Sequence, residues 1–184
     1  MKGRVKLAVG VAALAAVAAA GTVAVAGGGG SIREELTGYE EDPLVLSTTG
    51  NGSFRARIDE SRQEISYRLR YADLEGTVTQ AHIHLGGPRQ SGGISVFFCT
   101  NLGNGPAGTQ ACPPAPATVT GTIRPADVIG PAGQGITAGQ FDELVAAIRA
   151  GVTYANVHST LYPGGEIRAQ LEGGKGDRDR DSDD

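Results

Sequence analysis

The sequence predicts an all-β fold, an antiparallel β-sandwich or barrel-like domain with one short amphipathic helix near residues 138–150. Two observations lead to this class. Apolar and polar residues alternate with a period of two through most of the chain, which is typical of strands with one buried and one solvated face. The 29 glycines follow no fixed period, which indicates many tight turns between short strands rather than a fibrous chain.

The first expected elements form a hairpin with one wet face. Apolar residues alternate with Ser, Arg and Asp over 53–59, and with Glu, Ser and Arg over 64–71. A polar turn at residues 59–62 joins the two runs, which predicts an antiparallel pair. A weaker strand candidate at 34–39 precedes the hairpin. Five further strands are expected, at residues 78–85, 94–99, 117–123, 152–160 and 166–171.

One segment follows a helical period instead. Its apolar residues are spaced to share one helix face: Phe141, Leu144, Val145 and Ile148. Residues 137–140 (Thr-Ala-Gly-Gln) have the form of a capping box, and Gly151 stands where a helix C-terminal glycine belongs. The pattern therefore predicts a helix of about three turns over 138–150.

The last two strands can be placed in register from their polar residues. A three-residue loop at 163–165 (Pro-Gly-Gly) suits a hairpin with a glycine bulge, and it predicts three pairs on one face: His158 with Gln170, Thr160 with Arg168, and Tyr162 with Glu166. The predicted polar cluster is then Asn156, His158, Thr160, Glu166, Arg168 and Gln170. The same alternation puts Gln80, His82 and His84 on the polar face of their own strand.

The ends of the chain are expected to lie outside the folded domain. Residues 1–26 have the basic start, apolar centre and small-residue end of a secretory signal peptide, with an uncleaved membrane anchor as the alternative. Residues 27–31 form a Gly-rich spacer, 32–172 the β domain, and 173–184 a disordered charged tail. We therefore expect a secreted or extracytoplasmic protein with no stable membrane span once the signal is cleaved.

Charge and cysteine content limit the classes of function. The 16 basic residues less Lys2, Arg4 and Lys6 leave 13 against 20 acidic ones, a formal charge of −7, which argues against a nucleic-acid binder. The chain has two cysteines, Cys99 and Cys112, around a loop rich in Gly, Asn, Pro and Thr. In an exported protein this arrangement predicts a disulfide that closes the loop.

The segments, in this order, resemble the CHRD family, the domain repeated in chordin and found alone in many exported bacterial proteins. The resemblance rests on residues 81–86 (Ala-His-Ile-His-Leu-Gly), 154–159 (Tyr-Ala-Asn-Val-His-Ser) and 163–170 (Pro-Gly-Gly-Glu-Ile-Arg-Ala-Gln), and more weakly on 36–43. It implies a CHRD-type, β-sandwich-like extracellular module. It implies little chemistry, since the family has no settled molecular activity. Ser159 stands where the family usually has Thr.

The three histidines of the chain allow two interpretations. His82, His84 and His158 could hold one copper or zinc ion, with Glu166 or water as a fourth ligand, because imidazole is a good ligand for both metals. Alternatively, the histidines belong to a structural hydrogen-bond network with Glu166 and Arg168. The second interpretation is favoured on the sequence alone, and the convergence of the ring nitrogens would distinguish the two.

Enzymatic function has weaker support. The chain contains no Gly-x-Ser-x-Gly elbow, no phosphate-cradling glycine motif and no spacing that singles out a carboxylate pair. The expected function is therefore a non-catalytic extracellular binding module for an unknown protein or small ligand. The alternatives are a secreted copper- or zinc-binding protein and, least favoured, a metal-dependent enzyme using the same histidines.

Overall fold

A computed structural model describes residues 30–173 of the chain. The predictions for residues 1–29 and 174–184, which include the signal peptide and most of the spacer and tail, lie outside the described residues. Two residues at these boundaries belong to the fold instead: Ser31 opens the first strand, and the Gly173 amide donates to the Ile148 carbonyl. No helix in the described part of the chain has the length and apolar character needed to cross a membrane.

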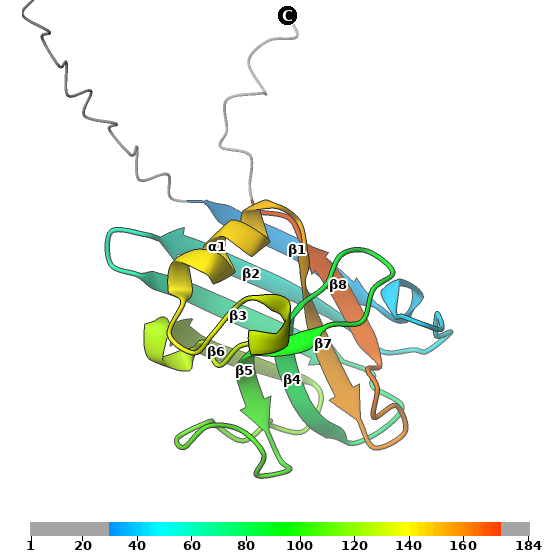
Figure 1. Cartoon of the computed structure of the whole chain (residues 1–184). Helices are drawn as coiled ribbons and strands as arrows, with labels where there is room; N and C mark the ends of the chain where they lie inside the picture. The colour runs from blue at the N-terminus through cyan, green and yellow to red at the C-terminus, as the bar shows by residue number, and fades with distance from the viewer. Residues whose placement is uncertain (1–29, 174–184) are drawn as a thin grey trace, which may run out of the picture.

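The described residues form eight strands and one α-helix, with three short 3₁₀ turns (Figure 1). The strands are β1 (Ser31–Thr37), β2 (Asn51–Asp59), β3 (Glu64–Ala72), β4 (Val78–Leu85), β5 (Gly93–Thr100), β6 (Ala117–Ile123), β7 (Thr153–Ser159) and β8 (Ile167–Leu171). The helix is α1 (Phe141–Arg149), and the 3₁₀ turns are η1 (Gly38–Glu40), η2 (Pro125–Asp127) and η3 (Ala132–Gln134).

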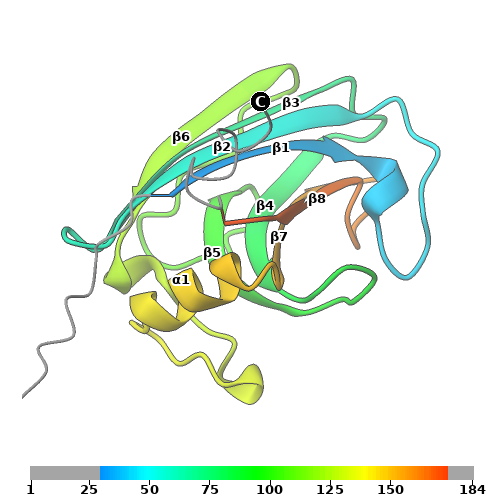
Figure 2. The ribbon, with the colours of Figure 1, turned by 90° about the horizontal axis from the view of Figure 1, so that it is seen from above.

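All eight strands belong to one antiparallel sheet in the order β5-β4-β7-β8-β1-β2-β3-β6. The sheet is rolled so that β1, β2, β3 and β6 form one curved layer and β5, β4, β7 and β8 the other (Figure 2). The two end strands, β5 and β6, lie near each other without a ladder of hydrogen bonds, so the barrel is nearly closed. The expected all-β, barrel-like class with one short helix is confirmed.

The core fills the space between the two layers. The inward residues of the strands, such as Phe54, Leu69, Ile83 and Phe98, are almost fully buried and form one apolar cluster. The apolar face of α1 joins the same cluster. A single core of this kind accounts for the period-two alternation, since every second residue of each strand enters it.

The helix begins later than its sequence pattern indicates. Gln140 is the N-cap residue, and its side chain makes no capping bond to the helix. Instead the Thr137 amide donates to Gln140 Oε1 (2.6 Å), so half of the expected capping box forms in the turn before α1. The C-terminal end is as expected, with Gly151 in the left-handed region at φ +68°.

The register of the last hairpin differs from the predicted one. His158 does not pair with Gln170, which lies opposite Tyr154, while Arg168 lies opposite Asn156 instead of Thr160. The loop is longer than three residues because the Ser159 amide donates to the Tyr162 carbonyl and a separate turn forms there. The shift is an even number of residues, so each side chain keeps its predicted face although its partner changes.

Candidate metal centre

The outer face of β4, β7 and β8 carries a polar row that is buried instead of solvated. Three covering segments pack over it, namely residues 38–46, 86–92 and 160–165. The row itself holds these segments: Asn156 Nδ2 donates to Glu41 Oε2 (3.1 Å), and Arg168 donates to the Gly87 carbonyl (2.9 Å). All seven residues of β7 are consequently buried, those facing out as well as those facing in.

The three histidines meet within this buried layer. Their exposed fractions are 0% for His82, 8% for His84 and 5% for His158. One ring nitrogen from each lies within 4.8 Å of those of the other two, and His82 Nδ1 is 3.2 Å from His158 Nε2. The ladder explains the convergence, since β4 and β7 are neighbours and His82 lies diagonally across from His158.

Backbone carbonyls define the proton positions of two of the rings. His84 Nδ1 lies 2.9 Å from the Gly92 oxygen, and His158 Nδ1 lies 3.1 Å from the Pro163 oxygen. Because a carbonyl only accepts, each Nδ1 carries the proton and each Nε2 presents a lone pair. This is the orientation in which a metal-binding imidazole is normally held.

The lone pairs are not satisfied by other protein groups. The Nε2 atoms of His82 and His84 are buried without a hydrogen-bond partner among the described residues. A proton on His82 Nδ1 satisfies His158 Nε2, whereas a proton on His82 Nε2 leaves two lone pairs facing each other. In each arrangement at least two acceptors stay unpaired, which costs about 1–3 kcal/mol apiece in a buried site.

Burial also keeps the three rings neutral. Desolvation, with the neighbouring histidines second, lowers the pKa of His82 to about 2. Desolvation likewise lowers the pKa of His84 and of His158 to about 4. Neutral imidazole is the form that binds metal, so this environment prepares the rings for a cation that brings its own charge.

The spacing suits a small transition-metal ion. Two nitrogens bound at about 2.0–2.1 Å in a tetrahedral site lie about 3.3 Å apart, close to the 3.2 Å between His82 Nδ1 and His158 Nε2. Ring nitrogens separated by up to 4.8 Å would have to approach each other by up to about 1.5 Å. Three imidazoles without a thiolate favour copper or zinc over magnesium or calcium, which prefer oxygen ligands.

Irregularities in β5 accompany the two histidines of β4. The β4–β5 register shifts between Ala81 and His82 and again between Ile83 and His84. The extra residues are Phe98 and Ser95 on β5, as in β-bulges, which often re-aim side chains next to functional sites. The alternation of the sequence gives no signal for these bulges.

Tyr154 and Arg168 support the histidine layer from one side. The Tyr154 ring stacks on the His84 ring, with centroids 4.9 Å apart and planes 4° from parallel. The Arg168 guanidinium in turn lies over the Tyr154 ring, 3.5 Å from its centroid. The Gly92 amide donates to Tyr154 Oη (3.0 Å), so Gly92 holds Tyr154 as well as His84. A Cβ at Gly92 would collide with the Leu85 carbonyl, which requires glycine here.

The predicted polar cluster divides into separate groups. Glu166 accepts from the Thr48 hydroxyl (2.9 Å) and the Glu75 amide (2.6 Å), and none of its described hydrogen bonds involves a histidine. Thr160 is exposed and accepts from the Thr77 amide. The expected His–Glu–Arg network is therefore wrong, and so is the expectation that Glu166 is a fourth metal ligand. Because the hairpin loop is longer than predicted, Glu166 lies against the loops that contain Thr48 and Glu75.

The remaining members of the polar cluster bind the covering segments. Gln170 donates to the Gly86 and Gly151 carbonyls (both 2.9 Å), and Asn156 binds Glu41. Desolvation raises the pKa of Glu41 to about 7. Glu41 was missed by sequence reasoning because its loop has no periodicity, whereas Tyr154 shares the parity of Asn156 and His158 and could have been assigned to their face.

The predicted disulfide is present and belongs to the apolar core, with Cys99 opposite Ala81 of β4. The Sγ atoms of Cys99 and Cys112 lie at bonding distance, 2.06 Å, and both cysteines are buried. The bond ties β5 to the segment that leads into β6. It thereby joins the two end strands of the nearly closed sheet.

Comparisons with known proteins give one result. Neither a search of curated proteins nor a search of solved structures found a match to the chain. The model of the CHRD domain matches residues 32–171, which include all three histidines and all eight strands except Ser31, the first residue of β1. Because this match spans most of the sequence, the chain belongs to the CHRD domain family.

Proposed function

We propose that this chain is an exported, non-catalytic binding module that holds one copper or zinc ion with His82, His84 and His158. Its CHRD domain suggests a binding or interaction role, and the metal is the ligand that the histidine layer fits best. The observation that carries the proposal is the convergence of three buried imidazoles, of which His82 Nε2 and His84 Nε2 have no hydrogen-bond partner among the described residues.

The competing role, a purely structural network, leaves too many groups unpaired. A buried polar network stabilises a fold when every member is satisfied, and a partly satisfied one is worse than an apolar cluster. Here Arg168 and Glu166 bind other groups, so they do not complete the bonding of the imidazoles. A cation bound to one nitrogen of each ring would take up lone pairs that no other described protein group satisfies, which favours the metal-binding role.

A binding titration tests the proposal directly. Metal-free protein would be titrated with Zn²⁺, Cu²⁺ and Cu⁺ by calorimetry, and bound metal would be counted after dialysis. We expect one equivalent to bind the wild type and binding to be lost in His82→Ala and in His158→Ala. At a free metal concentration of about 100 Kd, the bound ion should add about 2.7 kcal/mol to the free energy of unfolding.

The control variant is Gln80→Ala, which changes a polar residue directly opposite His158 on the same ladder. It should bind metal like the wild type. Circular dichroism of all variants separates loss of a ligand from loss of the fold. If the wild type binds zinc and copper no better than folded His82→Ala, the proposed metal site is wrong.

Export and the absence of catalysis are parts of the same proposal. The basic and apolar pattern of residues 1–26 and the buried disulfide both suit an oxidising compartment outside the cytoplasm. N-terminal sequencing of protein recovered from the cell envelope or medium should show cleavage near residue 26. An intact N-terminus in a membrane fraction would support the uncleaved anchor instead.

A further inference from the structure

The outer face of β1, β2, β3 and β6 carries a row of arginines on neighbouring strands. The ladder places Arg33 directly opposite Arg55, and Arg55 directly opposite Arg68. Arg57 and Arg70 flank this row on the same face, and all five side chains are exposed. We call these five residues the arginine face.

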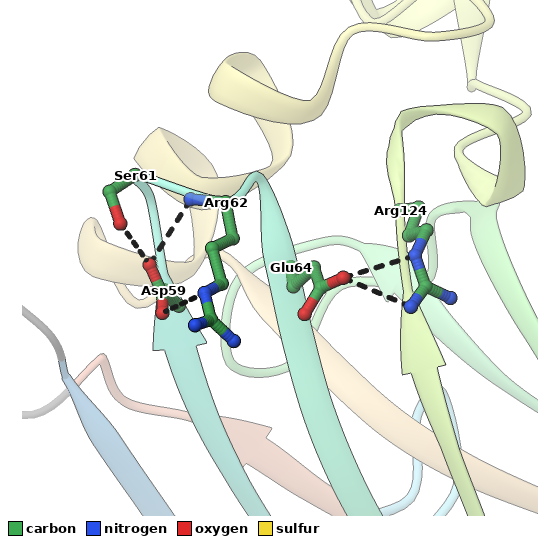
Figure 3. A network of polar contacts seen from close by, with 5 residues as sticks. All are labelled: Asp59, Ser61, Arg62, Glu64 and Arg124. Atoms are coloured by element: carbon green, nitrogen blue, oxygen red, sulfur yellow. Dashed lines mark hydrogen bonds and ion pairs between the residues drawn. The ribbon is translucent and has the colours of Figure 1, made fainter.

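None of the five forms an ion pair or side-chain hydrogen bond within the described part of the chain, although the sequence has 20 acidic residues. Two arginines outside the row, drawn in Figure 3, do form ion pairs. At the turn end of the same strands, Arg62 binds Asp59 (3.8 Å) and Arg124 binds Glu64 (2.9 Å). Asp59 and Glu64 are thus paired with arginines outside the row. Glu35, opposite Ser53, is a further carboxyl on the same face, but the five arginines outnumber it, so the face keeps a net positive charge in a chain whose net charge is −4.

This arrangement is unfavourable for the isolated domain. Like charges directly opposite each other on adjacent strands, about 4.8 Å apart, destabilise a sheet. Charged residues on edge strands can be explained as protection against aggregation, but β1, β2 and β3 are interior strands with a partner on each side. A bound polyanion would remove the repulsion.

We propose that the arginine face binds an acidic polysaccharide, one that carries carboxylate or sulfate groups. Arginine pairs with both groups through two parallel hydrogen bonds. Side-chain hydroxyls that can bond to sugar hydroxyls lie between the arginines on the same face: Ser31, Ser53, Ser66, Thr118, Thr120 and Thr122. A hollow of about 90 Å³ lined by Ser53, Arg55, Arg68 and Arg70 offers a place for one anionic group.

Other polyanions fit this face less well. The aromatic and aliphatic residues of β2 and β3 point into the core, for example Phe54 and Tyr67, so the face has no ring on which a base could stack. For the same reason no apolar side chain is available to enter a lipid bilayer. Figure 2 shows no described element over this face, which leaves room for an extended polymer across the four strands.

The experiment compares a sulfated and a carboxylated polysaccharide with a neutral one; dextran sulfate and dextran share a backbone and differ in charge. The full chain would be titrated with dextran sulfate, polygalacturonate and neutral dextran at low and moderate salt. Both acidic polymers should bind and neutral dextran should not. The double variant Arg55→Gln/Arg68→Gln should bind at least about tenfold more weakly at low salt, and its slope of log K against log salt should be shallower by up to about two.

The matched control is Arg62→Gln/Arg89→Gln, which removes the same charge from two exposed arginines outside the face. It should keep nearly all of the wild-type affinity. An equal loss in the control, or no binding by the wild type, would overturn the proposal. So would tighter binding to anionic vesicles or a DNA duplex, or binding that appears only after deletion of residues 174–184, which would make that acidic segment the occupant.

Discussion

The barrel has two polar outer faces, one buried and one exposed to solvent. Both arise from the same period-two alternation, yet the β4–β7–β8 face is buried under three covering segments while the β1–β2–β3–β6 face has no described element over it (Figures 1 and 2). The covered face holds neutral histidines with depressed pKa values. The open face holds arginines that keep their charge in water.

The difference shows that a polar row becomes a site of a particular kind through what lies above it. Covering a polar row removes water from it, so each buried polar group without a hydrogen-bond partner costs more free energy. Such a site favours a compact cation held by several ligands. Leaving a row open keeps each charge solvated, so it suits a large partner held by many weak contacts. The two faces therefore call for different experiments.

The largest expected contrast is in pH dependence. The folded-state pKa values of the histidines, about 2 to 4, lie below the ordinary value of 6.5. The unfolded chain therefore binds more protons than the folded one between pH 6.5 and 4, and stability must fall as the pH falls through this range. We expect the metal-free protein to lose several kcal/mol of unfolding free energy there, at about 1.4 kcal/mol for each pKa unit of each ring.

Urea titrations at half-unit pH steps would measure this loss. The expected slope comes from the three histidines of the covered face. The carboxyls of Glu41 and Glu34, whose pKa values are raised by burial, act in the opposite direction. A flat profile between pH 6.5 and 4 would mean that the imidazoles are solvated and that the covering segments do not seal the face.

The next contrast uses the same substitution on both faces. Arg168→Gln on the covered face removes a buried side chain, 2% exposed, that donates to the Gly87 and Gln90 carbonyls and stacks on Tyr154. We expect the free energy of unfolding to fall by about 3 kcal/mol. The substitution leaves the buried Gly87 and Gln90 carbonyls without their donor, and the shorter side chain leaves a cavity. Arg68→Gln should change stability by no more than about 0.5 kcal/mol.

Chemical denaturation of the two variants gives both values. Amide hydrogen exchange adds a local measurement: residues 86–92 should lose protection in Arg168→Gln and keep it in Arg68→Gln. Equal effects of the two substitutions would contradict the distinction between a covered and an open face.

The sequence predicted well which strand face each side chain occupies, and it did not predict the loop segments that cover the histidine face. Alternation assigned His82, His84 and His158 to outer faces, and it assigned Arg55 and Arg68 to a single wet face, because side-chain direction depends only on parity. The partner of His158 was wrong because any even shift keeps parity. The covering segments, the β5 bulges and Glu41 lie in irregular backbone, where no period connects a residue to its neighbours in space.

A smaller contrast concerns the pKa of a carboxyl group that is buried at the covered face. Burial raises the pKa of Glu41 to about 7, above its ordinary value of 4.5. The folded state therefore favours the protonated carboxyl, and the free energy of unfolding falls as the pH rises from 4.5 through 7 and this group ionises. Glu41→Gln, which stays neutral, should raise the unfolding free energy by about 2 kcal/mol at pH 8 and by little at pH 4.5.

The matched control is Glu35→Gln, an exposed carboxyl on the open face opposite Ser53. It should show no comparable gain at either pH. A uniform effect of Glu41→Gln from pH 4.5 to 8 would indicate a change in packing around Asn156 instead of the removal of a buried charge.

The smallest expected effect tests the open face alone. Arg55→Gln removes two directly opposed pairs of like charge, with Arg33 and Arg68, whereas Arg57→Gln removes none because Arg57 lies opposite Ser31 and Ser66. Without a ligand, Arg55→Gln should therefore stabilise the domain by about 0.2–1 kcal/mol more than Arg57→Gln does. Thermal unfolding at low salt would resolve the difference. It should vanish near 1 M salt, where screening acts within about 3 Å. A difference that persists at high salt would arise from packing, and the repulsion assigned to the arginine face would then be wrong.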